Sequence, residues 1–194
     1  MTYTNENILS GYNFARISDH VYAENITIDG EPVLKVNDID LSIIEEGQVF
    51  FCKTDKLLDL FRFLSNFPQW YDFKIITHES DYAIDEAIFN IKPKSVKKWF
   101  AINVNYDHED LVQIPLGLAN QHCKITLKIN NIVEKKDPKK LLYINHRVET
   151  NYKSRAWVYD YFSNNDWCSV KKPNLSLEEF SKDLSEHKFI LCPM

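Results

Sequence analysis

Residues 48–78 decide the fold of this chain, and they read QVFFCKTDKLLDLFRFLSNFPQWYDFKIITH. Residues 48–53 form a short, continuous apolar run, which is typical of a buried strand. Residues 73–78 form a second such run, and the segment between the two has helical spacing. A strand, a helix and a strand in this order predict a βαβ unit, and therefore a parallel sheet.

The helix of this unit has a start signal and a stop signal. Thr54 or Asp55 is expected to cap its first turn, and Phe67-Pro68 is expected to stop it. The residues expected on its apolar face are Leu57, Leu58, Phe61 and Leu64.

The same alternation extends in both directions from the βαβ unit. Residues 1–35 predict an irregular start with a short hairpin that turns at 29–32, and residues 81–94 predict a short helix or turn. Residues 98–104 and 111–118 are further strand candidates. Pro115 and Gly117 make the end of the second one an edge or a turn.

A second series of elements follows the polar stretch 130–140, which is the best linker candidate. It predicts strands at 141–145, 167–170 and 188–192, and helices at 154–162 and 176–184. Trp157, Val158 and Tyr161 are expected on the apolar side of the first helix, and Ser176 opens a capping box for the second. We therefore expect an α/β fold with a parallel sheet and flanking helices, divided into domains 1–137 and 138–194.

The second domain is short for its pattern, since three strands and two helices make half of a doubly wound domain. Either this segment packs onto the first sheet or the sequence is a fragment, and the pattern favours a fragment.

Composition excludes several classes of protein. Only 4 of 194 residues are glycine, against a usual ~7%, and no glycine-rich phosphate loop or nucleophile elbow is present. A net charge of -5 disfavours nucleic acid as a partner. Residues 1–138 carry 14 basic and 21 acidic side chains, whereas residues 139–194 carry 9 and 7, which fits a small anionic ligand better than a polyanion.

The cysteines and the termini indicate a cytoplasmic protein. Cys52, Cys123, Cys168 and Cys192 are far apart and have no metal-ligand spacing, so we expect reduced, mostly buried thiols and no metal or other cofactor. No secretory signal is visible, and no apolar run is long enough to span a membrane.

The strongest candidate site follows the strand at 141–145. Asn145 and Arg147 come at its carboxyl end, and Arg155 comes early in the next helix. Ligands of open α/β sheets bind at the carboxyl ends of strands, and guanidinium groups suit a diphosphate. In the alternative, both arginines are surface charges that pair with Glu149 and Asp160.

A second candidate follows the strand at 73–77, where His78 and the two carboxylates of Glu79 and Asp81 could supply a general base, with His78 or Asp81 expected to act as that base. In the alternative interpretation this is a solvated loop in which Asp81 caps the next helix. His108, between Asp107 and Asp110, has the same ambiguity. Aromatic residues could also form platforms that stack on sugars, although their spacing is more typical of a core. They are Trp70, Tyr71, Trp99, Phe100 and Trp157.

Several segments, taken in order over residues 48–194, resemble the exostosin-like glycosyltransferases. These segments are residues 98–103 (KWFAIN), 113–120 (QIPLGLAN), 142–145 (LYIN), 150–155 (TNYKSR) and 187–193 (HKFILCP). The family has two Rossmann-like domains that face a cleft, the GT-B arrangement.

The resemblance implies an acceptor-side domain that ends near residue 137, followed by the start of a nucleotide-sugar domain. Asn145, Arg147 and Arg155 match positions expected near the donor diphosphate. The main donor-binding residues of the family would come after residue 193, so the chain as given is expected to be inactive. The implied partners are a nucleotide-sugar donor and a glycan or small-molecule acceptor. The alternatives are a non-catalytic binding module and an unrelated α/β hydrolase that uses His78 and Asp81.

Overall fold

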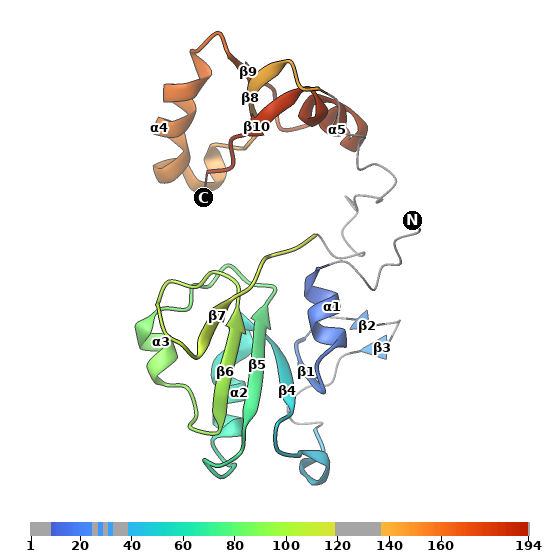
Figure 1. Ribbon diagram of the computed structural model, residues 1–194, viewed down its shortest axis with the longest axis vertical. Helices are drawn as coiled ribbons and strands as arrows, with labels where there is room; N and C mark the ends of the chain where they lie inside the picture. Colours follow the sequence, from blue (N-terminus) through green and yellow to red (C-terminus); the bar gives the residue numbers. More distant parts are fainter. Residues whose placement is uncertain (1–8, 25–26, 29–30, 33–38, 119–136, 194) are drawn as a thin grey trace. The chain divides into compact units, whose positions relative to one another are not determined.

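The computed structural model describes residues 9–24, 27–28, 31–32, 39–118 and 137–193 (Figure 1). The chain divides into two compact units, Met1–Cys123 (unit 1) and Lys124–Met194 (unit 2). Both units are mixed α/β with a parallel sheet flanked by helices, which is the Rossmann-like class expected from the sequence. Most of the expected linker, residues 130–136, lies outside the described residues, as does Cys123.

Unit 1 is built on a five-stranded sheet in which every strand runs parallel to its neighbour. The strands, in their order across the sheet, are β1 (His20–Tyr22), β4 (Val49–Lys53), β5 (Phe73–His78), β6 (Val96–Ala101) and β7 (Leu111–Gln113). All their carboxyl ends therefore meet at one edge of the sheet. The strands expected at 48–53 and 73–78 are confirmed, and the third expected strand begins two residues earlier, at Val96.

Helices α2 (Leu57–Leu64) and α3 (Glu86–Asn90) cover one face of this sheet and enclose its main core. A single 3-10 turn, η4 (Thr54–Lys56), precedes α2, and a second, η3 (Leu41–Ile43), lies before β4. Trp99 of β6 lies at the centre of the core. It is fully buried, and its indole N–H donates to the Thr77 hydroxyl at 2.9 Å.

Two details of the expected helix at 54–66 are wrong. The buried face of α2 includes Leu60, whereas Leu58 is exposed, because positions i, i+3, i+4 and i+7 from Leu57 face the sheet. No side chain caps the start of α2, because the chain enters it directly from η4.

The opposite face of the sheet is covered by α1 (Gly11–Arg16), which the sequence pattern did not reveal, as it did not reveal β1. Ala15 of α1 packs in a smaller core with Phe51 and Ile76. Ser10 caps α1 by accepting the N–H of Asn13 at 3.3 Å. The expected hairpin is present as β2 (Thr27–Ile28) and β3 (Glu31–Pro32), but the expected turn at 29–32 is too long, because Glu31 and Pro32 already form the second strand.

Unit 2 has a three-stranded parallel sheet of its own, so its strands do not extend the sheet of unit 1. The order across the sheet is β10 (His187–Ile190), β8 (Lys140–Ile144) and β9 (Cys168–Val170). Lys140, the last residue of the expected linker, already begins β8. The helices of unit 2 are α4 (Tyr152–Ser163), which follows the 3-10 turn η6 (Glu149–Asn151), and α5 (Leu177–Ser185).

Strand β8 lies at the centre, and the chain crosses it between β9 and β10. This places α4 and α5 on opposite sides of the small sheet (Figure 1). Tyr143 of β8 is fully buried against Phe180 of α5, and its hydroxyl donates to Asp183 at 3.2 Å. The capping box of α5 is present as expected, with Ser176 and Glu179 bonded to each other's main chain.

The expected apolar side of α4 is wrong. Val158 is buried, but Trp157 is 65% exposed and Tyr161 is 70% exposed. Val158 is the one buried residue of the helix among those described, because a three-stranded sheet offers α4 little surface to cover. The interpretation of aromatics as core holds for Trp99 and fails for Trp157 and for Trp70, which is also 65% exposed.

The cysteines are less buried than expected. Cys52 is buried in β4, Cys168 is half-buried in β9 and Cys192 is exposed after β10, all as free thiols. None of the helices in the described part of the chain is long and apolar enough to cross a membrane.

Candidate functional site

The carboxyl edge of each parallel sheet holds the polar side chains that the sequence singles out. Ligands of such sheets bind outside this edge, where loops and helix starts gather. In unit 1, His78 ends β5 and Asp81 follows it. In unit 2, the residues that follow β8 are Asn145, Arg147 and Arg155.

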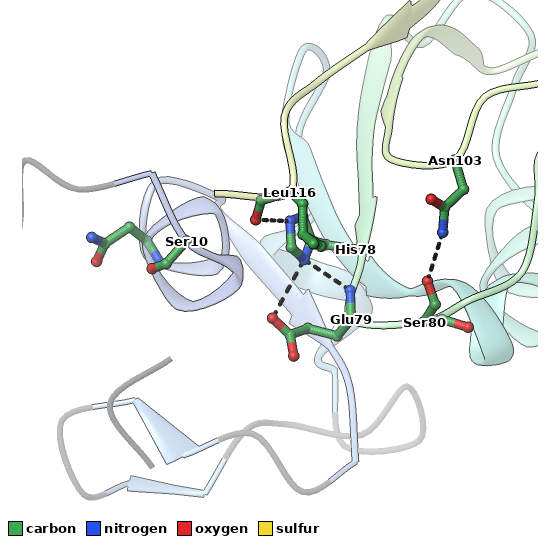
Figure 2. A network of polar contacts seen from close by, with 7 residues as sticks. Ser10, His78, Glu79, Ser80, Asn103 and Leu116 are labelled. Atoms are coloured by element: carbon green, nitrogen blue, oxygen red, sulfur yellow. Dashed lines mark hydrogen bonds and ion pairs between the residues drawn. The ribbon is translucent and has the colours of Figure 1, made fainter. Parts of the chain in front are cut away.

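His78 is the last residue of β5 and is almost fully buried, at 2% exposure. Its Nδ1 lies 2.9 Å from the main-chain nitrogen of Glu79, and its Nε2 lies 3.1 Å from the carbonyl oxygen of Leu116 (Figure 2). Because Nδ1 accepts the N–H of Glu79, the ring proton sits on Nε2, which donates to Leu116. Both ring nitrogens are therefore occupied by the main chain.

Glu79 brings a carboxylate onto this histidine. Its Oε1 lies 3.3 Å from Nδ1 of His78, and its backbone has a φ of +59°. The left-handed region is uncommon for residues other than glycine, and strain of this kind gathers at functional sites. Gly11 of α1 makes room for the carboxylate, since a Cβ at position 11 would lie 1.6 Å from the same Oε1.

Asn103 is the second left-handed residue at this edge, with a φ of +54° two residues after the end of β6. Its Nδ2 donates to the carbonyl oxygen of Ser80 at 3.1 Å, which joins the loops after β5 and β6 (Figure 2). The loop that carries Glu79 is therefore held in place from its far side as well.

Asp81 is exposed, and the structure does not bring it to His78. No hydrogen bond or ion pair joins these two side chains, both of which are among the described residues. Asp85, and not Asp81, caps α3, by accepting the N–H of Ile88 at 2.9 Å. Glu79, and not Asp81, supplies the carboxylate that contacts His78.

The side chain of His108 is held by contacts within the fold. Its Nδ1 accepts the N–H of Asp110 at 3.0 Å, and its ring packs on Phe89 with the centroids 4.4 Å apart. Asp110 in turn pairs with Lys98 at 3.0 Å, and this cation holds the pKa of the Asp110 carboxyl below its ordinary value. These contacts fold the loop after β6 onto α3.

The carboxyl edge of unit 2 gathers the residues that follow all three strands. Asn145, after β8, donates its Nδ2 to the carbonyl oxygen of Lys172, after β9, at 2.8 Å. Arg147 donates from Nη2 to Oδ1 of Asn174 at 3.0 Å. The loops after β8 and β9 are therefore tied together by the side chains expected to bind phosphate.

Arg155, in the first turns of α4, links the end of the third strand, β10, to the loop after β8. Its Nε donates to the carbonyl oxygen of Pro193, after β10, at 3.1 Å, and its Nη1 donates to the carbonyl oxygen of Arg147 at 3.0 Å. The same Nη1 contacts the hydroxyl of Thr150. The structure thus brings Asn145, Arg147 and Arg155 together at one edge.

Neither arginine has a carboxylate partner among the residues that the structure describes. The alternative expectation was that they pair with Glu149 and Asp160, but no ion pair of Arg147 or Arg155 occurs in the described ranges. Their hydrogen bonds go to uncharged oxygens, so both positive charges are held in place without being neutralised.

Comparison with protein-family models and with curated proteins gives no match for this chain. Any function proposed for it must rest on its own residues.

Two lysines that the sequence reasoning missed belong to the same edge. Lys171 and Lys172 come directly after β9, and both are exposed. In the described structure neither ammonium group makes a hydrogen bond or an ion pair. Their position after the expected strand 167–170 was the signal that could have identified them. With the two arginines they make four cations at one edge.

His146 lies beside this group of cations and is uncharged near neutral pH. Burial lowers its pKa most and the charge of Arg155 lowers it further, while the main chain of Leu191 offsets part of this effect. Neither ring nitrogen has a hydrogen-bond partner of normal geometry in the described structure, and the ring meets Tyr159 edge-on at 6.0 Å. The positive charge of the edge therefore comes from arginine and lysine.

The described residues hold no group of three or more His, Cys, Asp or Glu side chains arranged to bind a metal ion. What the two edges can do chemically follows from their charges. The unit 2 edge is suited to bind a dianion through guanidinium and ammonium donors. The unit 1 edge presents a partly accessible carboxylate backed by an imidazole, which is suited to hold a proton.

Proposed function

We propose that this chain is part of a glycosyltransferase of GT-B type, in which unit 2 binds the diphosphate of a nucleotide-sugar donor. The observation that carries the proposal is the group of four cations at the carboxyl edge of unit 2, formed by Arg147, Arg155, Lys171 and Lys172, none of which pairs with a carboxylate of the described residues. Charged donors of this kind are required by the leaving group of a sugar transfer, a nucleoside diphosphate.

The strand order of unit 2 supports the same assignment. The order β10-β8-β9 puts the point where the chain reverses direction between β8 and β10, and doubly wound sheets bind ligands there. Arg155 spans this point, since it bonds Pro193 after β10 and Arg147 after β8.

The reaction needs a base for the acceptor. An acceptor hydroxyl oxygen forms the new bond to the anomeric carbon, the bond from that carbon to the phosphate oxygen breaks with its electron pair, and the hydroxyl proton passes to a base. We assign the base to the loop after β5, with His78 and Asp81 as the residues expected from the sequence. The side chain of Glu79 is 22% exposed and that of His78 only 2%, so of these two neighbours it is the carboxylate of Glu79 that an acceptor can reach, and the carboxylate of Asp81 is exposed as well.

Calorimetric titration of the chain with UDP and with GDP tests the donor assignment. We expect binding of at least one of them, and a loss of affinity of about tenfold or more in Arg147→Ala, because hydrogen bonds between charged groups contribute ~1.5–3 kcal/mol. Arg62→Ala is the matched control, since Arg62 is an exposed arginine of unit 1 paired with Asp59 at 2.6 Å. The proposal fails if neither nucleotide binds at about 1 mM, or if Arg147→Ala binds as the wild type does.

A non-catalytic binding module is the second candidate function, and the burial of His78 favours it. Both ring nitrogens of His78 are bonded to the main chain, so the ring is not free to take a proton from a substrate without breaking one of these bonds. This candidate keeps the fold but lacks a working donor site, so it predicts that neither UDP nor GDP binds. The hydrolase alternative required a hydrogen bond between His78 and Asp81, which is absent between these two described residues.

A further inference from the structure

His146 lies at the point where the ends of β8 and β10 meet. It comes two residues after β8, and the main chain of Leu191, directly after β10, is held beside the same strand. The N–H of Leu191 donates to the carbonyl oxygen of Tyr143 at 2.9 Å. The imidazole of His146 meets this main chain on one side and the ring of Tyr159 in α4 on another, edge-on at 6.0 Å. The ring is therefore enclosed at the carboxyl edge of unit 2.

Both ring nitrogens of His146 are buried, and in the described structure neither has a hydrogen-bond partner of normal geometry. A neutral imidazole carries one donor and one acceptor, and the large majority of buried polar atoms in native proteins are paired. His78 follows this rule, because the main chain occupies both of its ring nitrogens. The unpaired nitrogens of His146 are an exception of the kind that accompanies binding and catalytic roles.

The groups around this ring are cationic or uncharged. Burial lowers the pKa of His146 most, and the charge of Arg155 lowers it further. Arg155 lies against the same loop, since its Nη1 donates to the carbonyl oxygen of Arg147 at 3.0 Å. The ring also meets Tyr159 and the main chain of Leu191, and no carboxylate of the described residues pairs with it. The imidazole therefore stays uncharged at neutral pH as long as nothing offsets the charge of Arg155.

We propose that His146 is a fifth cation of this edge that depends on the ligand, taking up a proton from solvent when a diphosphate binds and then holding the diphosphate more tightly. This inference rests on the proposed function of unit 2. A dianion bound to Arg155 offsets the charge of that guanidinium and attracts the imidazolium. Because the ring nitrogens are already buried, the ligand removes little further water from them, and the attraction outweighs the cost of burial.

The charged ring has an acceptor at hand, the main chain of Leu191, whose interaction with the imidazole favours the protonated form. No other group of this edge supplies the same response between about pH 5.5 and 7.5, because cysteine, tyrosine, lysine and arginine side chains ordinarily titrate above about pH 8. His187, the other histidine of unit 2, is the first residue of β10 and so lies at the opposite edge of the sheet. The pH dependence of binding is therefore assigned to His146.

Calorimetric titration with UDP and with GDP at pH 7.5 and at pH 5.5 tests the inference on wild type and His146→Gln. Glutamine keeps a polar side chain but cannot gain a proton. We expect the two proteins to bind equally at pH 7.5, and His146→Gln to bind about tenfold more weakly at pH 5.5. The terminal phosphate of the nucleotide itself titrates near pH 6, and comparing two proteins at one pH removes this contribution. His108→Gln, a change in unit 1, is the control and is expected to bind as the wild type does at both pH values.

Proton NMR follows the imidazole of His146 in the wild type, so the inference does not depend on how the variant folds. The signal is assigned by its absence from His146→Gln, and its titration midpoint is expected to move to higher pH when the nucleotide is bound. A nucleotide that binds without moving this midpoint, or that binds equally to wild type and His146→Gln at pH 5.5, overturns the inference and leaves the proposed function standing. If neither nucleotide binds at about 1 mM, both fail together.

Discussion

Glu79 folds back onto its own neighbour in the chain, so that its Oε1 lies 3.3 Å from Nδ1 of His78. Successive residues of a strand point to opposite faces, and this contact exists only because the backbone of Glu79 leaves the strand with a φ of +59°. Main-chain strain at one residue therefore places the carboxylate beside the imidazole at the carboxyl edge of unit 1.

The strain at Glu79 can be measured by replacing its side chain. We expect Glu79→Gly to be more stable than Glu79→Ala by about 1–2 kcal/mol, because the left-handed region costs an L-residue about that amount and costs glycine nothing. Urea denaturation measures the difference in unfolding free energy between the two variants. Because both variants lack the carboxylate, its loss does not contribute to this difference.

Asp81 supplies the control for that comparison. It lies two residues further along the same loop and does not have a positive φ. Asp81→Gly is therefore expected to be no more stable than Asp81→Ala. An equal preference for glycine at both positions would show that the effect comes from the loop and not from the conformation of Glu79.

The core of unit 1 predicts a large contrast between two leucines of α2. Leu60→Ala is expected to cost about 2–5 kcal/mol of unfolding free energy, because Leu60 is fully buried. Leu58→Ala is expected to stay within about 0.5 kcal/mol, because Leu58 is exposed. Urea denaturation of both variants checks this, and equal losses would contradict the observed orientation of the helix.

This pair of leucines shows what the sequence could and could not predict. Long apolar runs such as β4 and β5 were identified correctly, since their residues are apolar whichever face they occupy. The buried face of α2 follows the i, i+3, i+4 and i+7 spacing from Leu57, so the sequence does contain this signal, and the choice of Leu58 in place of Leu60 was an error in applying it. Helix α1 was missed because its six residues carry no periodic signal, and its place is defined by contact with Phe51 and Ile76.

The candidate site likewise contains residues that the sequence could place and residues that it could not. Asn145, Arg147 and Arg155 were identified from their position after a strand, because the carboxyl edge of a parallel sheet follows from strand order alone. Glu79 could not be placed against His78, because that contact requires a positive φ at a residue with no sequence preference for it. The exposure of Trp157 and Tyr161 depends on how little sheet α4 covers, which is a tertiary property.

His146 predicts an acid-sensitive unit 2. Its pKa lies below the ordinary value of 6.5 in the folded protein, mainly through burial. The unfolded chain therefore binds the proton more readily, and stability is lost as the pH falls below about 6.5. We expect His146→Phe to lose less stability than the wild type between about pH 7.5 and pH 5.5. Urea midpoints at both pH values measure this, and an identical loss in both proteins would contradict it.

Arg147 and Arg155 are predicted to differ in how much they contribute to the stability of the fold. Three oxygens of the chain accept hydrogen bonds from Arg155, including the carbonyl oxygens of Pro193 and Arg147. Arg155→Ala is therefore expected to cost about 1–2 kcal/mol of unfolding free energy, since partly exposed bonds from a charged group contribute less than buried ones. Arg147 makes one exposed bond, to Asn174, and Arg147→Ala is expected to cost less than about 0.5 kcal/mol.

The affinity for UDP is expected to fall when either arginine is replaced, whereas stability is expected to fall only when Arg155 is replaced. Nη2 of Arg155 makes no hydrogen bond in the described structure and can therefore contact a phosphate. Arg155→Lys is expected to lose this contact, and with it part of the affinity, and also to lose the hydrogen bonds that join the loops. Arg147→Ala is expected to lose affinity while its urea midpoint stays unchanged. Calorimetry at low and at high salt checks the electrostatic origin, since added salt weakens attraction between exposed charges. If the urea midpoints of Arg147→Ala and Arg155→Ala fall together, Arg147 holds the loops together in the same way as Arg155 and is not available for a ligand.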